Sequence, residues 1–429
     1  MRAVCLYTAL MSPSPSHRED VPAGLPRLLA AAPHRPLFLA GTVAVILTML
    51  WWTLELASIR FGWSHWPQPA RIPPGWAHAM AIQYGLFPLF MFGFLMTTFP
   101  RWMDGPAVPP RRYLPVAGGV LAGYVLANLG YLGLPSLMTL GYVVMLAGYV
   151  IGVTTLAGVL ARAENRNKHG WSCLAAFTVG TLGLAAWVAV LTGLLPAGWG
   201  WLPVKLGTYL FLLPIYVTVC HRMLPFFTRN ILVRQGADYE MYRPGWTLPV
   251  VWALLALHFL LEWRDLLAWR VLADVPLAVV FAWHAVKWQP WRATRPGLLG
   301  VLHLAFAWLP VAFILFSVQD IVLAAGGPMV LGRAPLHALA IGFFGSMLVG
   351  MVTRVTHGHS GRPLEMGFVP WLCVWLLQAV AVVRILAETA PDMYLWLVVA
   401  GIGWLVAFLP WVVRGAWIYL TPRRDGKAG

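Results

Sequence analysis

The sequence predicts an all-α integral membrane protein, a polytopic bundle of about twelve transmembrane helices. Of its 429 residues, 60% are hydrophobic and 10% are charged, whereas a soluble domain has about 25% charged residues. The 24 tryptophans suit the two membrane–water interfaces, where an indole ring lies half in water. The net charge of +15 is concentrated between apolar runs. It therefore orients the chain in a lipid bilayer and does not indicate a nucleic-acid partner.

Each predicted helix is an apolar run of about 20 residues, the length that crosses the hydrocarbon core of a bilayer. Twelve such runs follow one another along the chain, and the seventh is the shortest. The runs occupy residues 36–58, 77–99, 114–133, 136–160, 171–194, 202–223, 247–262, 267–286, 299–325, 335–356, 367–388 and 393–419.

The basic residues support this count independently. Of the 30 Lys and Arg residues, all but seven fall in the N-terminal tail, in loops after even-numbered helices, or after the last helix. The seven on the other side are Arg60, Arg71, Lys205, Arg264, Arg270, Arg333 and Arg384. By the positive-inside rule, both termini are cytoplasmic. A missed or extra helix would have scrambled this alternation.

One membrane domain is expected over residues 34–420. Residues 1–33 are rich in Pro, Ser and Arg, a composition that predicts a disordered cytoplasmic tail. Residues 421–429 form a second, short cytoplasmic tail.

The four cysteines are scattered, with no C-x-x-C pair, which argues against a disulfide framework or a structural zinc site. They are Cys5, Cys173, Cys220 and Cys373. The sequence also contains no phosphate-binding loop, no H-E-x-x-H motif and no C-x-x-C-H motif for covalent haem.

The alternation assigns a depth to each histidine. His78, His258 and His337 lie towards the outer face. The cytoplasmic layer consists of His34, His221, His284, His303, His357 and His359. Because neutral imidazole binds iron and copper, and two imidazoles from facing helices can hold haem iron, two layers of histidine allow two redox-metal sites.

For each single histidine, the alternative is an amphipathic side chain at the headgroup level. We assign His65, His169 and His284 to this alternative, because each lies at a polar helix end beside ordinary loop residues. His303 and His337 are stronger candidates, since each begins an unbroken apolar run where polar groups are costly.

The run 335–356 carries a stripe of small residues, Gly342, Ser346 and Gly350, with Arg354 next in line. Such a stripe lets another helix or a flat cofactor approach closely. Plain helix packing is the simpler explanation of the stripe, although histidines at both ends of the run favour a site.

Cys220 and His221 pair a thiol with an imidazole, a combination that copper favours. Neighbours on a helix point about 100° apart, so joint ligation requires the helix to end there, which Pro225 makes plausible. Arg222 and Arg229 would contact haem propionates or lipid phosphates, or serve only as topology determinants.

Several charged residues lie in the outer parts of the predicted helices: Glu55, Glu262, Asp320, Arg384 and Glu388. Asp320 either pairs with Arg384 or belongs to a proton path, for which Glu55 and Glu388 are further candidates. The sequence does not choose between these two roles.

Several motifs resemble the NnrS family of haem- and copper-containing membrane proteins, which are linked to nitric oxide metabolism and nitrosative stress. The matching residues are Arg35-Pro36, Phe38-Leu39, 225–230 (PFFTRN), 302–304 (LHL), 307–310 (AWLP), 337–339 (HAL), Gly342, Gly345, Met347, Thr353-Arg354 and 358–364 (GHSGRPL). At residues 76–80 (WAHAM), one histidine stands where the family often has two followed by an acidic residue. Cys220-His221 likewise departs from the family pattern, which indicates a divergent branch.

The resemblance implies twelve helices, haem and copper, and a location in the bacterial cytoplasmic (inner) membrane. A small gaseous or metal-nitrosyl ligand is expected. We expect His78 and His337 to form an outer ligand pair. The expected inner ligands are His221, His303 and His359. The expected cofactor-supporting residues are Arg35, Arg222, Arg354, Arg362 and Cys220.

Two other functions remain open. A secondary transporter would explain twelve helices with a longer loop, 222–246, between two sets of six, but carriers of that kind usually show internal repeats, and none is visible. A quinol-linked reductase of the haem–copper type would need an electron-donor site and a proton route. Only Asp320, Glu55 and Glu388 hint at such a route.

Overall fold

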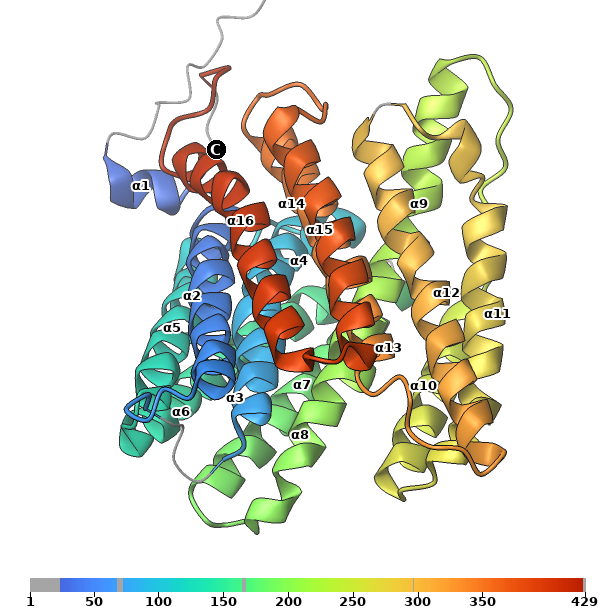
Figure 1. The fold of residues 1–429 in the computed structure, drawn as a ribbon. Coiled ribbons are helices and arrows are strands. Elements are labelled where there is room, and N and C mark those ends of the chain that lie inside the picture. Colours follow the sequence, from blue (N-terminus) through green and yellow to red (C-terminus); the bar gives the residue numbers. More distant parts are fainter. Residues whose placement is uncertain (1–23, 68–71, 164–166, 296, 427–429) are drawn as a thin grey trace, which may run out of the picture.

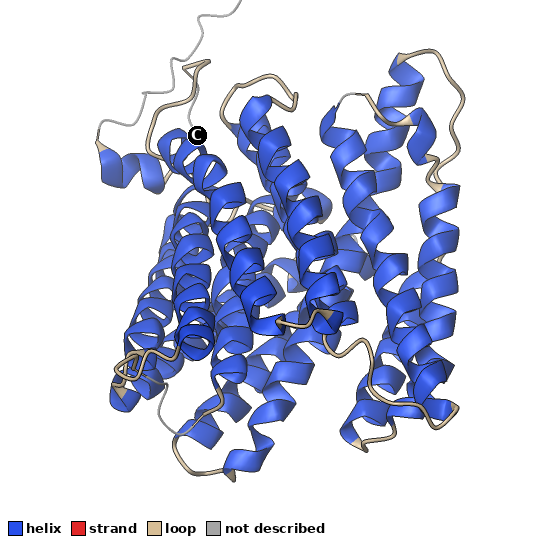
Figure 2. Cartoon of the chain, viewed as in Figure 1, coloured by secondary structure: helices blue, strands red, loops and turns tan. Residues whose placement is uncertain are grey.

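The computed structural model describes residues 24–67, 72–163, 167–295 and 297–426, and within these ranges the chain forms helices and no strand (Figure 2). Residues 1–23 of the predicted N-terminal tail and residues 427–429 lie outside the described residues. A short helix, α1 (Leu25–Leu29), precedes the first long one.

Eleven helical stretches among the described residues are long and apolar enough to cross a membrane. They are α2 (His34–Phe61), α3–η1–α4 (Pro74–Trp102), α5 (Pro110–Tyr131), α6 (Pro135–Ala161), α7 (Lys168–Leu191), η2–α8–η3–α9 (Ala197–Arg234), η4–α11–η5 (Leu267–Arg292), α12 (Gly297–Ala324), α13–η6–α14 (Ala334–His359), α15–η7 (Phe368–Thr389) and α16 (Met393–Tyr419). The predicted seventh run forms α10 (Thr247–Trp263), a shorter apolar helix. The predicted polytopic helical bundle is therefore confirmed.

The helices run up and down the bundle, so that α1 and the end of α16 lie at the same end (Figure 1). We call this the basic end, because most Lys and Arg residues of the described chain lie there, in the loops after α4, α6, α9, α11 and α14, in the helix turns beside these loops, and in the terminal segments. The other end is called the opposite end. Helix α2 packs against α16, α5 against α6, and α11 against α12.

Glycines allow the closest of these contacts. A Cβ atom on Gly123 of α5 would lie 2.4 Å from the carbonyl oxygen of Gly141 in α6, and one on Gly130 would lie 2.3 Å from the Met138 nitrogen. Small residues at helix interfaces let backbones approach in this way within lipid. The α5–α6 pair is thus a packing unit set to one side of the bundle (Figure 1).

Three spans contain a π-helical segment, and these are the three spans whose apolar windows are most buried. The segments are η1 (Ala81–Leu86), η3 (Gly207–Leu212) and η6 (Ala338–Gly345). Pro88 and Pro214 follow the first two. Because proline has no N–H, the carbonyl four residues earlier loses its partner; the Tyr84 carbonyl instead accepts from the Tyr149 hydroxyl at 2.7 Å. Such widened turns often mark functional sites.

Candidate functional site

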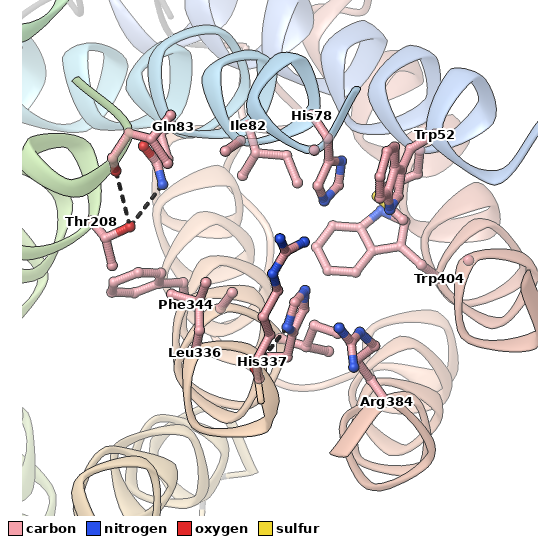
Figure 3. Close-up of a pocket in the computed structure, with 18 of the residues that line it drawn as sticks. Trp52, His78, Ile82, Gln83, Thr208, Leu336, His337, Phe344, Arg384 and Trp404 are labelled. Carbon is pink, nitrogen blue, oxygen red and sulfur yellow. Dashed lines mark hydrogen bonds between the residues drawn. The ribbon is translucent and has the colours of Figure 1, made fainter. Parts of the chain in front are cut away.

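A cavity of about 230 Å³ lies between the three π-helical spans and helices α2, α15 and α16, near the opposite end. Its walls are largely aromatic and aliphatic, with polar side chains from several helices. The polar lining residues are His78, Gln83, Lys205, Thr208, Arg333, His337 and Arg384, and the tryptophans are Trp52, Trp76 and Trp404. Figure 3 shows His78 and His337 facing this space from two different spans. The two predicted outer ligands therefore line one cavity.

Backbone contacts fix which nitrogen His337 presents. Its Nδ1 lies 2.9 Å from the carbonyl oxygen of Arg333. A carbonyl only accepts hydrogen bonds, so Nδ1 carries the proton and Nε2 keeps its lone pair. Helix α13 (Ala334–His337) ends here and η6 begins at the next residue, which directs the ring into the widened part of the span.

His78 is held by stacking. Its ring lies on the indole of Trp52, with centroids 4.3 Å apart and an angle of 15° between the planes. The Nδ1 atom of His78 is buried and has no hydrogen-bond partner among the described residues. Buried polar atoms are normally satisfied, so this nitrogen is available to a group bound in the cavity.

The cavity is also electropositive. Arg384 pairs with Glu388 at 2.7 Å, and Lys205 pairs with Glu262 at 2.6 Å. Arg333 forms no ion pair within the part of the chain that the structure describes. A guanidinium without a carboxylate suits an anionic group on a ligand, because its planar donors match carboxylate and phosphate oxygens. Two imidazoles, aromatic walls and a free guanidinium fit a haem-type group.

Two polar side chains of the cavity lining, Gln83 and Thr208, are hydrogen-bonded to each other. The amide Nε2 of Gln83 in η1 donates to the Thr208 hydroxyl in η3 at 2.7 Å (Figure 3). The Gln83 Oε1 atom is buried without a partner. A Cβ atom on Gly207 would lie 2.1 Å from that oxygen, so this glycine makes room for the amide. The π turns of two spans are joined at this point.

At the basic end, His359 contacts His34, which was not among the predicted ligands. Their ring centroids are 4.6 Å apart. Arg35, next to His34, donates from Nη1 to the carbonyl oxygens of Tyr419 and Thr421, each at 3.0 Å. Arg362 is buried and its Nη1 has no partner among the described residues. The predicted residues Arg35, His359 and Arg362 thus belong to one part of the bundle.

A second histidine group contains two of the three histidines that were assigned from the sequence to ordinary interfacial positions, His169 and His284. His169 Nε2 lies 3.0 Å from His221 Nδ1, and the His284 ring centroid lies 6.1 Å from that of His221. His169 and His284 occupy polar helix ends, as the sequence indicated, but α7 packs against α9 and turns His169 inward. Only knowledge of this helix contact would have revealed the group.

The protonation pattern of this group follows from its hydrogen bonds. Asn167 Oδ1 accepts from the backbone N–H of His169 at 2.9 Å and also contacts His169 Nδ1 at 2.8 Å. His169 Nδ1 therefore carries a proton, and its Nε2 accepts from His221 Nδ1. This leaves a lone pair on His221 Nε2, which is buried and has no partner.

The remaining predicted residues lie elsewhere. The structure corrects the predicted helix end at Cys220-His221, because α9 (Leu213–Arg234) continues through Pro225. Cys220 therefore does not share a direction with His221. His303 Nε2 contacts the Thr228 hydroxyl at 3.0 Å. The described residues contain no group of three or more His, Cys, Asp or Glu side chains that could hold a metal ion by themselves.

Two predicted arginines lie against aromatic rings. The guanidinium of Arg222 is 4.5 Å from the Trp102 ring centroid, and that of Arg354 is 3.7 Å from the Phe227 ring centroid. The small-residue stripe of η6 and α14 (Ser346–His359) packs against α12: a Cβ on Gly342 would meet Trp308 at 2.4 Å, and one on Gly350 would meet Leu302 at 2.8 Å. The stripe serves helix packing.

The acidic residues named from the sequence occupy three separate places. Asp320 pairs with Arg270 at 2.7 Å, and Arg384 pairs with Glu388, so the suggested Asp320–Arg384 pair does not form. Glu55 Oε2 accepts from the Trp66 indole N–H at 2.7 Å. Each of these three acids has a different partner: Arg270 for Asp320, Arg384 for Glu388 and Trp66 for Glu55.

Comparison with known proteins agrees with the motifs. A family model described as NnrS protein matches residues 28–423, nearly the whole chain. No curated protein matches the sequence.

Proposed function

This chain belongs to the NnrS family, and from that premise we propose that it is a haem- and copper-containing protein of the bacterial cytoplasmic membrane. It handles nitric oxide or its metal adducts, in nitric oxide metabolism and the response to nitrosative stress. The observation that carries the proposal is the cavity between His78 and His337. It combines two oriented imidazoles, aromatic walls and an unpaired guanidinium.

His78 and His337 would hold the haem, and Arg333 would meet its acidic groups. Bound haem would supply a redox-active iron at this place. The protein's own contribution is orientation: Trp52 stacks on His78, and the Arg333 carbonyl fixes the tautomer of His337.

Copper is best supported at His221 near the basic end. Its Nε2 lone pair is buried and unpartnered, and the hydrogen bond to His169 orients the ring. Imidazole is a good copper ligand, and a neighbour that orients a ligand ring is typical of metal sites. His284 is the nearest further imidazole. His303, His34 and His359 are the alternative positions.

The protein purified from haem- and copper-replete cells tests this proposal. An optical spectrum and a metal analysis should reveal a Soret band and copper in the same preparation. Protein with neither a Soret band nor copper would contradict it.

Two alternative functions have less support. The π-helical segments occur in the second, sixth and tenth helices. If the second six helices repeated the first six, such segments would also be expected in the fourth, eighth and twelfth helices, and the described residues have none there. A six-plus-six transporter would be expected to repeat its broken helices in both halves. A quinol-linked reductase would need a proton route, and its three candidate residues, Asp320, Glu388 and Glu55, are bonded to three different partners, Arg270, Arg384 and Trp66.

A further inference from the structure

A buried ionic network lies beside the cavity, in the half of the bundle near the opposite end. Its centre is His258 of α10, which is fully buried. Five ionisable neighbours come from four other segments and from α10 itself: Lys205 of α8 (Trp201–Leu206), Glu262 of α10, Arg270 of η4 (Leu267–Arg270), Asp274 of α11 (Val271–Lys287) and Asp320 of α12. Asp274 went unnoticed in the sequence.

The contacts form a chain that reaches the cavity wall. Asp274 Oδ1 lies 2.6 Å from His258 Nδ1, and His258 Nε2 lies 3.5 Å from Glu262 Oε2. The other oxygen of Glu262 lies 2.6 Å from Lys205 Nζ. Lys205 lines the cavity. The order from the interior to the cavity is therefore Asp274, His258, Glu262 and Lys205.

Two buried atoms that face each other in this series of contacts lack a hydrogen-bond partner among the described residues, and one added proton would join them by a hydrogen bond. His258 Nδ1 donates to Asp274, since a carboxylate oxygen accepts. His258 Nε2 and Glu262 Oε2 then face each other, and neither has a hydrogen-bond partner. A lone pair facing a carboxylate oxygen is repulsive. A proton on Nε2 turns this contact into a charge-assisted hydrogen bond and satisfies both atoms.

The charge balance leads to the same conclusion. Glu262, Asp274 and Asp320 supply three carboxylates, whereas Lys205 and Arg270 supply two cations. The network carries one excess negative charge when His258 is neutral, and none when His258 is an imidazolium. An uncompensated charge inside a membrane is costly. Rings of Tyr209 and Phe316, with centroids 4.2 and 5.4 Å from that of His258, enclose the site.

We propose that His258 and its three carboxylates hold one exchangeable proton and pass it to the cavity through Glu262 and Lys205. The Lys205 ammonium gives a proton to water or to an anion in the cavity, and its neutral amine takes one from His258 by way of Glu262. An N–H bond of His258 breaks as an O–H bond forms on Glu262, that O–H bond breaks as an N–H bond forms on the Lys205 amine, and the N–H bond that Lys205 breaks is replaced by a bond to hydrogen on the water or anion. The site would serve any cavity ligand that takes up protons, so it does not depend on the proposed cofactors.

Nitrogen-15 NMR of the full-length protein, labelled at histidine and held in lipid nanodiscs, tests the first half of the proposal. One of the 12 histidines should remain an imidazolium at mildly alkaline pH, and Asp274→Asn or Glu262→Gln should remove that signal. An imidazolium that survives both substitutions, or none in the wild-type protein, would overturn the proposal.

Hydrogen–deuterium exchange of the same signal tests the route. Lys205→Met should slow exchange by about a hundredfold, the scale of a positioned proton-transfer group. Lys205→Arg keeps the cation beside Glu262 but cannot release a proton, so exchange should stay slow. If Lys205→Arg exchanged as fast as the wild-type protein, the positive charge alone would explain the exchange rate. This result would overturn the proposed proton transfer through Lys205. Arg60→Gln, which breaks the exposed Arg60–Asp392 pair, is the matched control and should change neither signal nor rate.

Discussion

The histidines near the two ends of the bundle are held in different ways. At the opposite end, His78 and His337 line a cavity, and neither ring is hydrogen-bonded to a side chain of the described residues. At the basic end, His169 bonds His221, and His34 packs on His359. Open space between imidazoles suits a large group, whereas in the His169–His221 pair a single ring nitrogen, His221 Nε2, is left without a partner among the described residues. The two ends are therefore expected to hold different kinds of cofactor.

Removing an imidazole from the cavity should have the largest effect. His78→Ala or His337→Ala should abolish most of the haem absorbance, because each removes one of the two imidazoles that would hold the haem. An optical spectrum of each purified variant measures this. His65→Ala, which changes an exposed histidine, is the matched control. A Soret band of full intensity in both cavity variants would contradict the assignment of haem to the opposite end.

Changes in the His169–His221 pair should affect copper and leave haem intact. His221→Ala should abolish most copper binding, and His169→Ala should lower copper affinity by about 10- to 100-fold, as expected when a group that orients a ligand is lost. Competition with a copper chelator measures both. His303→Ala discriminates between positions: a loss as large as that of His221→Ala would move the site towards α12. Equal loss of haem and copper would indicate misfolding.

The junction of two π turns should contribute to stability. Thr208→Val keeps the side-chain shape but leaves the buried Gln83 amide without its acceptor, which should lower the unfolding free energy by about 1–3 kcal/mol. Thermal unfolding in detergent measures the change. Thr154→Val removes a hydroxyl that bonds only to its own helix at an exposed position and is the control. If Thr208→Val and Thr154→Val lowered the unfolding free energy equally, the hydrogen bond between the two π turns would contribute no more to stability than an exposed hydroxyl does.

The smallest effect is expected at the surface. Arg60 and Asp392 form an exposed ion pair at 2.7 Å, and exposed pairs contribute little because water and salt screen them. Arg60→Gln should leave the thermal midpoint and both cofactor contents unchanged. A clear fall in either content would indicate that this surface supports the cavity.

The helices were predictable because lipid imposes a strict rule of about 20 apolar residues per crossing. The shortest predicted run, residues 247–262, is also the one that forms a shorter apolar helix, α10. The shared cavity of His78 and His337 was also within reach, since topology puts both residues at the same depth. Sequence reasoning missed His169, His284 and Asp274. Each owes its role to a neighbour on another helix, and a single sequence contains no record of which helices touch. The same reason explains the wrong end of α9, where tertiary packing carries the helix past Pro225.

Chemical rescue tests the central claim most directly, namely that the cavity between His78 and His337 holds the haem. His337→Gly should lose the Soret band, and free imidazole added to the purified variant with haem should restore it by occupying the vacated position. His303→Gly, treated in the same way, should neither lose the band nor respond to imidazole. A Soret band that persists in His337→Gly without imidazole would contradict the account.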